Sequence, residues 1–306
     1  MFTNFHKKIR ERIFKKPAQV ILEPTNACNL NCPYCMVGMQ NELLQKHGSA
    51  SHNLMTRPIG FMTKETFDVV RKELKKFGIR KVYLHFQGEP LLNKLTPEFA
   101  TTLKKDNFEV GIFTNGHAFN DKNIKELSNA AVNLIRFSVD GASEQTYQQN
   151  RVGGKFEKVY ENMKKVAAAH QGKKTRIEWQ FLVLKNNENE VETARKMAKE
   201  IGIHFFTKGY RESVPSLAPE NSAYRSKYHQ KPCKDIYHQL GIYWNGDVVP
   251  CCYDVDGKKI MGNLLKQSLN EIWDGMKYRD FRKRVDDFKK SPDNEPDICK
   301  NCLRWK

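Results

Sequence analysis

Strand-like and helix-like patterns alternate along most of the chain. The apolar run at residues 20–22 predicts a first strand, and from residue 63 onward short apolar runs alternate with stretches whose apolar positions recur at helical spacing. Six strands with intervening helices are the pattern of a parallel sheet with right-handed crossovers. The later strands are predicted at residues 81–86, 108–113, 134–139, 176–184 and 204–207, and the helices at 97–105, 121–130, 156–170 and 188–201, with another beginning after Thr63.

Three other segments lack this alternation. Residues 36–61 are polar and predicted to be irregular, and because they exceed an ordinary connection we expect a lid over a site or a mobile stretch. Residues 212–232, with Pro215 and Pro219, are interpreted as a linker. Residues 1–17 carry six Lys and Arg among apolar positions at helical spacing. They predict a basic amphipathic helix that either packs on the sheet or attaches to an anionic membrane surface or a partner.

Cys28, Cys32 and Cys35 lie shortly after the first predicted strand and are the strongest chemical signal in the chain. A four-iron four-sulfur cluster normally takes four thiolates, so three closely spaced cysteines would leave one iron open to a substrate or cosubstrate. A structural zinc site is the alternative, although zinc usually has close to four protein ligands. The loop therefore favours an iron-sulfur cluster.

This loop resembles that of the radical S-adenosylmethionine (radical SAM) superfamily, in which a C-x3-C-x2-C loop follows the first strand and an aromatic residue, here Tyr34, precedes the last cysteine. The resemblance implies a partial (β/α)6 TIM-like barrel, whose active site lies at the carboxyl ends of the strands. Gly88 and Glu89 follow the second strand and resemble the family's Gly-Glu motif. By that match Glu89 would accept from the SAM ammonium, while Gly88 allows close backbone approach.

Three further residues are interpreted through the same resemblance. Ser138, at the end of the fourth strand, would contact SAM, and Arg151 would pair with its carboxylate. A surface arginine is the alternative for Arg151. Asp140 is either a turn former or helix cap, the commonest role of Asp before Gly, or a catalytic or ribose-binding residue.

The remaining cysteines form a second group near the C-terminus. Cys233, Cys251, Cys299 and Cys302 provide four thiolates, enough for a complete auxiliary cluster, although a four-cysteine zinc ribbon is the alternative. The group resembles the SPASM/twitch domains appended to radical SAM barrels. Four residues follow Cys302, so one auxiliary cluster is expected. The eighth thiol, Cys252, is a spare buried thiol, an alternative ligand or a hydrogen-atom donor, and the last role would favour an epimerase.

The expected organisation is an N-terminal helix at residues 1–17, a radical SAM barrel at 18–211, a linker at 212–232 and a SPASM/twitch domain at 233–306. Residues 1–16 lack the apolar core of a secretory signal, so we expect a cytoplasmic protein whose cysteines are metal ligands. No apolar run approaches the length of a membrane span. The net charge of +17 is spread along the predicted helices without an RNA-binding motif. It indicates a solvated surface and suits an anionic small-molecule substrate better than nucleic acid.

The resemblance implies that the chain cleaves SAM to a 5′-deoxyadenosyl radical, which removes hydrogen from an unactivated C–H bond. We expect oxidation of a hydroxyl-bearing carbon on a sugar or cyclitol, with the auxiliary cluster as electron acceptor and a reductase such as flavodoxin or ferredoxin as partner. Peptide modification by epimerisation or crosslinking is the alternative enzyme function. An iron-sulfur or zinc protein that binds nucleic acid without radical chemistry is the alternative from another class.

Overall fold

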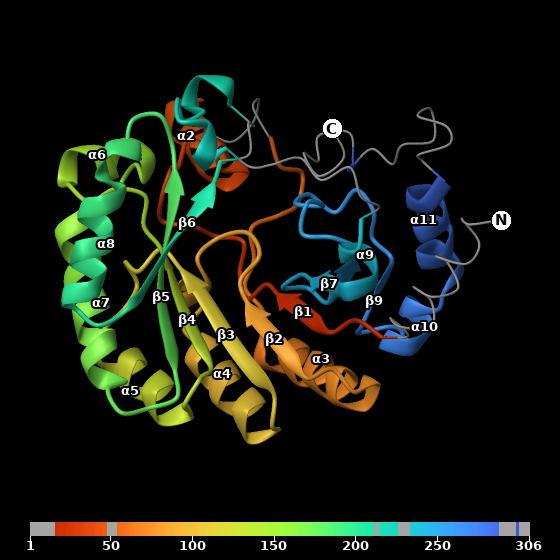
Figure 1. The fold of residues 1–306 in the computed structure, drawn as a ribbon. Coiled ribbons are helices and arrows are strands. Elements are labelled where there is room, and N and C mark those ends of the chain that lie inside the picture. Colours follow the sequence, from red (N-terminus) through yellow and green to blue (C-terminus); the bar gives the residue numbers. More distant parts are fainter. Residues whose placement is uncertain (1–15, 48–53, 211–213, 226–232, 288–297, 300–306) are drawn as a thin grey trace.

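In the computed structural model, residues 16–47, 54–210, 214–225, 233–287 and 298–299 are described. They form one sheet in the order β6-β5-β4-β3-β2-β1-β7-β8-β9 (Figure 1). Pairing is parallel from β6 through β7 and antiparallel at β8 and β9. The strands are β1 Gln19–Leu22, β2 Lys81–Leu84, β3 Glu109–Thr114, β4 Leu134–Ser138, β5 Arg176–Val183, β6 His204–Gly209, β7 Gln239–Ile242, β8 Asp247–Val249 and β9 Gly262–Asn263.

Helices cover the outer face of the curved strands, as Figure 1 shows for α3, α4, α5, α7 and α8. The six strands predicted from the sequence are confirmed, and so are the crossover helices and the partial barrel that they build. Thr63 caps α3 as predicted, because its side chain accepts from the Thr66 amide. The helices are α2 Met36–His47, α3 Lys64–Phe77, α4 Thr96–Lys105, α5 Asp121–Ala130, α6 Glu144–Asn150, α7 Phe156–Ala169, α8 Val191–Glu200, α9 Asp235–His238, α10 Leu269–Trp273 and α11 Met276–Asp287.

The prediction of an irregular segment after the first cysteine loop is wrong for residues 36–47, which form α2. Its buried residues are Val37, Gly38 and Gln40, so burial does not follow an apolar stripe that the sequence could show. The helix packs closely on the loop before it, because a Cβ on Gly38 would lie 2.4 Å from the Cys32 amide nitrogen. The short helix α6 was also missed. Within the predicted linker, residues 214–225 include two 3₁₀ turns, Pro215–Leu217 and Ser222–Tyr224.

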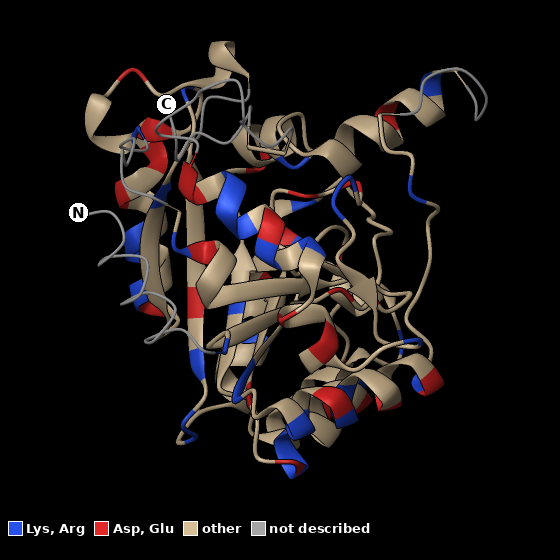
Figure 2. Cartoon of the chain, turned by 90° about the vertical axis from the view of Figure 1, so that its right-hand side faces the viewer, with Lys and Arg blue, Asp and Glu red and all other residues tan. Residues whose placement is uncertain are grey.

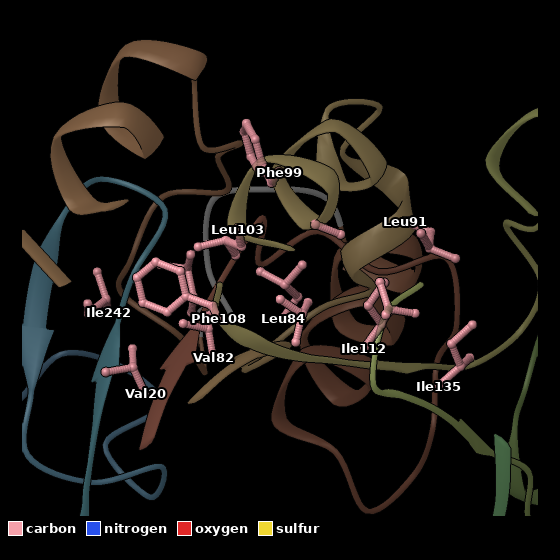
Figure 3. Close-up of a cluster of buried hydrophobic side chains, with 14 of the residues drawn as sticks. Val20, Val82, Leu84, Leu91, Phe99, Leu103, Phe108, Ile112, Ile135 and Ile242 are labelled. Carbon is pink, nitrogen blue, oxygen red and sulfur yellow. The ribbon is translucent and has the colours of Figure 1, made fainter. Parts of the chain in front are cut away.

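Alternate positions on the strands face opposite sides of the sheet. One set is apolar and packs under the helices, where Figure 3 shows Val20, Val82, Leu84, Ile112 and Ile135 in the buried cluster. Burial of this face stabilises the fold by about 25 cal/mol per Å² of apolar surface. The other set mixes polar residues with aromatic and aliphatic ones and lines the inside of the barrel. The core therefore lies between the sheet and its outer helices.

Two sequence-based expectations about the surface can be compared with the structure. The described part of the chain contains no helix that is long and apolar enough to cross a membrane. Figure 2 shows Lys and Arg interleaved with Asp and Glu on the side that it presents, which suits a solvated basic surface. The predicted amphipathic helix falls almost wholly on residues 1–15, outside the described residues.

The C-terminal segment continues the barrel sheet, which the sequence did not predict. Strand β7 pairs in parallel with β1, with Gln19 opposite Gln239 and Leu22 opposite Ile242. Strand β1 therefore has a parallel neighbour on each side, because β2 pairs with its other edge. The loops that follow β1 and β7 leave the sheet at the same end.

A buried ion pair joins these two loops. Glu23, directly after β1, is 0% exposed and its two carboxylate oxygens accept from Arg57 at 2.8 and 3.0 Å. The Arg57 guanidinium lies 3.5 Å from the ring centroid of Tyr243, directly after β7. Asp256 accepts from the amides of Thr56 and Arg57 at 2.7 and 3.1 Å. Residues 56–57 thus connect the barrel to the C-terminal segment through these contacts.

Replacing Glu23 with Ala should destabilise the protein by about 3–5 kcal/mol, because the Arg57 charge is then left buried without its partner. Urea unfolding of the two proteins measures this difference in the free energy of unfolding. Glu161→Ala is the matched control, since Glu161 pairs with Lys164 at 2.6 Å on the exposed surface. Its free energy of unfolding should be unchanged, and equal losses in the two variants would contradict the structural role of Glu23.

Candidate active site

The first cysteine loop is held at the carboxyl end of the sheet. Cys32 is buried, while Cys28 and Cys35 are half-buried. The Cys35 amide donates to the Cys32 carbonyl at 3.1 Å, and α2 begins immediately afterward. The Asn41 side chain on α2 donates to the carbonyls of Cys28 and Leu30 at 3.0 and 3.2 Å. The helix that the sequence did not predict therefore fixes the shape of the loop.

Two side-chain donors face the sulfurs of this loop. The Arg151 guanidinium lies 3.8 Å from Cys32 Sγ, and the side-chain amide nitrogen of Asn115 lies 3.9 Å from Cys28 Sγ. Burial raises the pKa of Cys28 to about 12 and that of Cys32 to about 11, so both thiols are protonated until a metal displaces the protons.

The donor set fits an iron-sulfur cluster. Among the described residues, no three Cys, His, Asp or Glu side chains converge as they would on a single metal ion. The loop nevertheless offers three soft sulfur ligands, and N–H donors toward such sulfurs are a common feature of these clusters.

Gly88 brings the second-strand loop onto the cysteine loop. Its φ is +75°, and a Cβ there would lie 2.4 Å from the Ala27 carbonyl oxygen. The Glu89 amide donates to the same oxygen at 2.8 Å. Glycine is therefore required for contact between two loops of the chain itself, whatever ligand lies beside them.

Glu89 is a buried carboxylate at the centre of the site. It accepts from Thr114 Oγ1 at 2.8 Å, from the Asn115 amide at 2.6 Å and from the Leu91 amide at 3.1 Å. Burial outweighs these hydrogen bonds and raises its pKa to about 7. A carboxylate has about four acceptor positions, so these three donors leave capacity for one more, such as an ammonium.

Asp140 organises the other side of the cysteine loop. Its Oδ2 accepts from Tyr34 Oη at 2.5 Å and from Arg151 Nε at 2.8 Å, and its Oδ1 accepts from the Leu182 amide at 2.7 Å. Arg151 is therefore held beside Cys32 with 13% of its side chain exposed, a position unlike that of a surface arginine. Asp140 does more than form a turn, because it orients both Tyr34 and Arg151. Ser138 is half-buried at the end of β4.

A cavity of about 660 Å³ lies on the inner face of the sheet, and Tyr34 of the cysteine loop is part of its wall. None of the described residues that line it is Asp or Glu. Apart from Tyr34 and Cys252, the sequence analysis did not single out these lining residues. Several of them occupy alternate positions on the strands, and this spacing is a signal that could have identified them. The lining side chains that carry nitrogen are Gln19, His85, Arg136, Gln180, Lys208 and Gln239.

Cys251 and Cys252 are adjacent in the sequence but lie in different environments. Cys251 is buried, and the Tyr253 amide donates to its sulfur at 3.4 Å. Cys252 lines the cavity, where Gln239 donates to its sulfur at 3.8 Å. Cys233 and Cys299 are half-buried against the hydrophobic core, and Cys302 lies outside the described residues.

Comparison with known proteins matches both halves of the chain. Residues 22–198 match the radical SAM superfamily, and residues 233–303 match the SPASM iron-sulfur cluster-binding domain. The S-adenosyl-L-methionine-dependent 2-deoxy-scyllo-inosamine dehydrogenase of Niallia circulans is 23% identical over 93% of this chain and 92% of that protein. A probable GTP 3′,8-cyclase of Methanocaldococcus jannaschii is 28% identical over 58% of this chain and 54% of that protein.

Solved structures share the fold. SuiB of Streptococcus suis bound to S-adenosylmethionine has a TM-score of 0.68 at 14% identity and covers 91% of this chain and 72% of that chain. BtrN in complex with AdoMet and 2-DOIA has a TM-score of 0.57 at 18% identity and covers 94% of this chain and 92% of that chain.

Anaerobic reconstitution with iron and sulfide should give about eight irons per chain, from two four-iron clusters. Replacement of Cys28, Cys32 and Cys35 together with Ala should lower this to about four. Iron and acid-labile sulfide analysis measures both values. Cys252→Ala is the control and should keep about eight irons, whereas full iron content in the triple variant would exclude the loop as a ligand set.

SAM binding should weaken as the pH falls from 8 to 6. A bound ammonium favours the ionised form of Glu89, and a carboxylate with a pKa of about 7 becomes protonated over this range. The affinity should fall by up to about tenfold per pH unit below 7. Equilibrium dialysis of labelled SAM checks this, with Glu89→Gln binding more weakly and losing the slope. A slope that persists unchanged in Glu89→Gln would assign it to another group.

Proposed function

The chain belongs to the radical SAM superfamily and carries a SPASM-type iron-sulfur domain, and from this we propose that it oxidises a hydroxyl-bearing carbon of a sugar- or cyclitol-type small molecule. The family match confirms the prediction of a radical SAM enzyme that uses SAM and two [4Fe–4S] clusters. It also counts against the alternative of a nucleic-acid-binding protein without radical chemistry.

Cys28, Cys32 and Cys35 would hold the SAM-binding cluster, and Cys233, Cys251, Cys299 and Cys302 the auxiliary cluster. When bound, these groups and SAM supply a radical that removes a hydrogen atom and an acceptor for the electron that oxidation releases. Glu89, Arg151, Ser138 and Tyr34, with Gly88 shaping the loop, would orient SAM. A flavodoxin or ferredoxin would be the external reductase, in a cytoplasm that keeps the thiols reduced.

The cavity carries this proposal. Its volume of about 660 Å³ lies within the range of small-molecule sites, and Tyr34 makes it continuous with the cysteine loop. Three glutamine side chains in its wall, Gln19, Gln180 and Gln239, can donate to and accept from hydroxyl groups. The Niallia circulans protein, which aligns over nearly its whole length, is named a 2-deoxy-scyllo-inosamine dehydrogenase, and this supports the same reaction class.

The charge of the lining favours an anionic substrate. Arg136 and Lys208 reach the cavity, and its described lining contains no carboxylate. Glu178 pairs with Arg136 at 2.7 Å, but the same carboxylate also pairs with Arg176 at 2.6 Å. A carboxylate or phosphate group on the substrate would complement this positive wall.

Epimerisation is the second candidate, because Cys252 lines the same cavity. A thiol there could return a hydrogen atom to the face of the substrate radical opposite to the one from which hydrogen was removed. The sulfur-centred radical left behind would then need one electron and one proton to regenerate the thiol. Oxidation and epimerisation therefore differ in whether the substrate loses two hydrogen atoms.

Incubation of the reconstituted enzyme with SAM, dithionite and a polyol panel in deuterated water tests these proposals. The panel contains myo-inositol, 2-deoxy-scyllo-inosamine, glucuronate, glucose 6-phosphate and myo-inositol 1-phosphate. Mass spectrometry should find 5′-deoxyadenosine together with a carbonyl product. The acidic compounds should react at least about tenfold faster than the amine, 2-deoxy-scyllo-inosamine. A tenfold ratio corresponds to about 1.4 kcal/mol of free energy.

Other outcomes select other functions. One deuterium gained at carbon without loss of two hydrogens, and abolished by Cys252→Ala, would indicate epimerisation. If no panel compound raises 5′-deoxyadenosine above the substrate-free rate, oxidation of such polyols is excluded and peptide modification becomes the function to test.

A further inference from the structure

His85 occupies a position in the cavity wall that the binding of clusters and SAM does not explain. It follows β2 directly, and its backbone amide donates to the Leu22 carbonyl at 3.0 Å. Its ring stacks on Phe113 with the centroids 4.2 Å apart and the planes 11° from parallel. No described residue forms a hydrogen bond with either ring nitrogen, and the side chain is part of the cavity lining.

Charged and titratable groups face this imidazole from several strands. Tyr83 lies beside it on β2, with ring centroids 6.4 Å apart, and Arg136 on β4 and Lys208 on β6 line the same cavity. Burial, and then the charges of Lys208 and Arg136, lower the pKa of His85 to about 3. The imidazole is therefore neutral at physiological pH and has one nitrogen able to accept a proton.

No other described side chain in the lining offers a neutral nitrogen base. The polar ones are the two cations, the three glutamines, the Cys252 thiol and phenols such as Tyr34, whose hydroxyl already donates to Asp140. Oxidation of an alcohol to a carbonyl requires a group that takes the hydroxyl proton.

We propose that His85 is the catalytic base that accepts the hydroxyl proton of the substrate. This inference rests on the proposed oxidation. The C–H bond of the hydroxyl-bearing carbon breaks, and its hydrogen atom leaves to the SAM-derived radical. The O–H proton then moves to a nitrogen of His85, one electron leaves to an acceptor of the iron-sulfur class, and the C–O bond becomes C=O.

An anionic substrate would improve this base. A carboxylate or phosphate group beside Lys208 and Arg136 offsets the positive charge that disfavours protonation of His85. The pKa of the imidazole then rises, which makes the ring a better proton acceptor. His85 therefore links the charge of the substrate to its oxidation.

Two variants separate hydrogen removal from proton transfer. His85→Phe keeps a ring that can stack on Phe113, and His85→Asn keeps a polar group, but neither can act as a base. The probe is the panel compound that the wild type oxidises fastest. We expect 5′-deoxyadenosine formation within about threefold of wild type and carbonyl product reduced about 100-fold or more, the usual contribution of a general base.

Chemical rescue by a small-molecule base distinguishes a catalytic role from a purely structural one, because a structural defect would not be repaired by added imidazole. In His85→Ala, added imidazole should restore part of the carbonyl product, whereas it should have no effect on the wild type. His204→Asn is the matched control, because His204 is an exposed histidine at the start of β6. Its ratio of carbonyl product to 5′-deoxyadenosine should equal that of the wild type.

Three results would overturn the assignment. Carbonyl product at the wild-type ratio in both His85→Phe and His85→Asn would exclude His85 while leaving the proposed oxidation intact. Parallel loss of iron and 5′-deoxyadenosine in every His85 variant would show that the residue is structural. If the wild type oxidises no compound of the panel, the proposed function fails and this inference fails with it.

Discussion

Parallel pairing of β1 with β2 on one edge and with β7 on the other is the constraint on which the site depends. In both pairs Leu22 of β1 lies opposite the last residue of its neighbour, Leu84 in β2 and Ile242 in β7. The three strands therefore end at the same edge of the sheet. This brings together the cysteine loop, the Gly88 turn and the loop after β7. The antiparallel strand β8 then runs back along β7 and brings Cys252 beside Gln239 in the cavity wall. A shift of β7 by one residue would exchange its two faces and remove Gln239 from the cavity.

The place where β1, β2 and β7 end contains the carboxylate of Glu23, whose charge would be costly to bury without a cationic partner. Glu23 is fully buried where the three loops diverge, and burial raises its pKa despite the two bonds from Arg57. Such an ion pair contributes little net stability compared with apolar packing, yet losing either partner is costly. It therefore acts more on specificity than on stability, because only the register that brings residue 57 over Tyr243 satisfies both charges.

The sequence predicted the elements whose signals are local. Strand periodicity located β2 to β6, and the spacing of Cys28, Cys32 and Cys35 located the first loop. Helix α2 was missed because its buried residues are Val37, Gly38 and Gln40, and these do not form an apolar stripe. The pairing of β7 with β1 was missed because it joins residues 220 positions apart, and nothing local encodes such a contact. Most of the cavity lining, apart from Tyr34 and Cys252, was missed because it is spread over alternate residues of separate strands.

Charge is divided between the two ends of the space that these elements enclose. Beside the cysteine loop, Glu89 and Asp140 are buried carboxylates, and Arg151 pairs with Asp140. The cosubstrate expected there carries a sulfonium and an ammonium, which suit Glu89, and a carboxylate, which suits Arg151. Across the cavity, Arg136 and Lys208 are cations and the described lining has no acid. Because interactions between charges are stronger away from water, the basic wall disfavours the cationic groups of the cosubstrate and favours an anionic substrate. This division gives SAM and the substrate separate positions in one space, without a separate domain for each. It also places the neutral His85 on the basic side, where the proposed oxidation needs a proton acceptor.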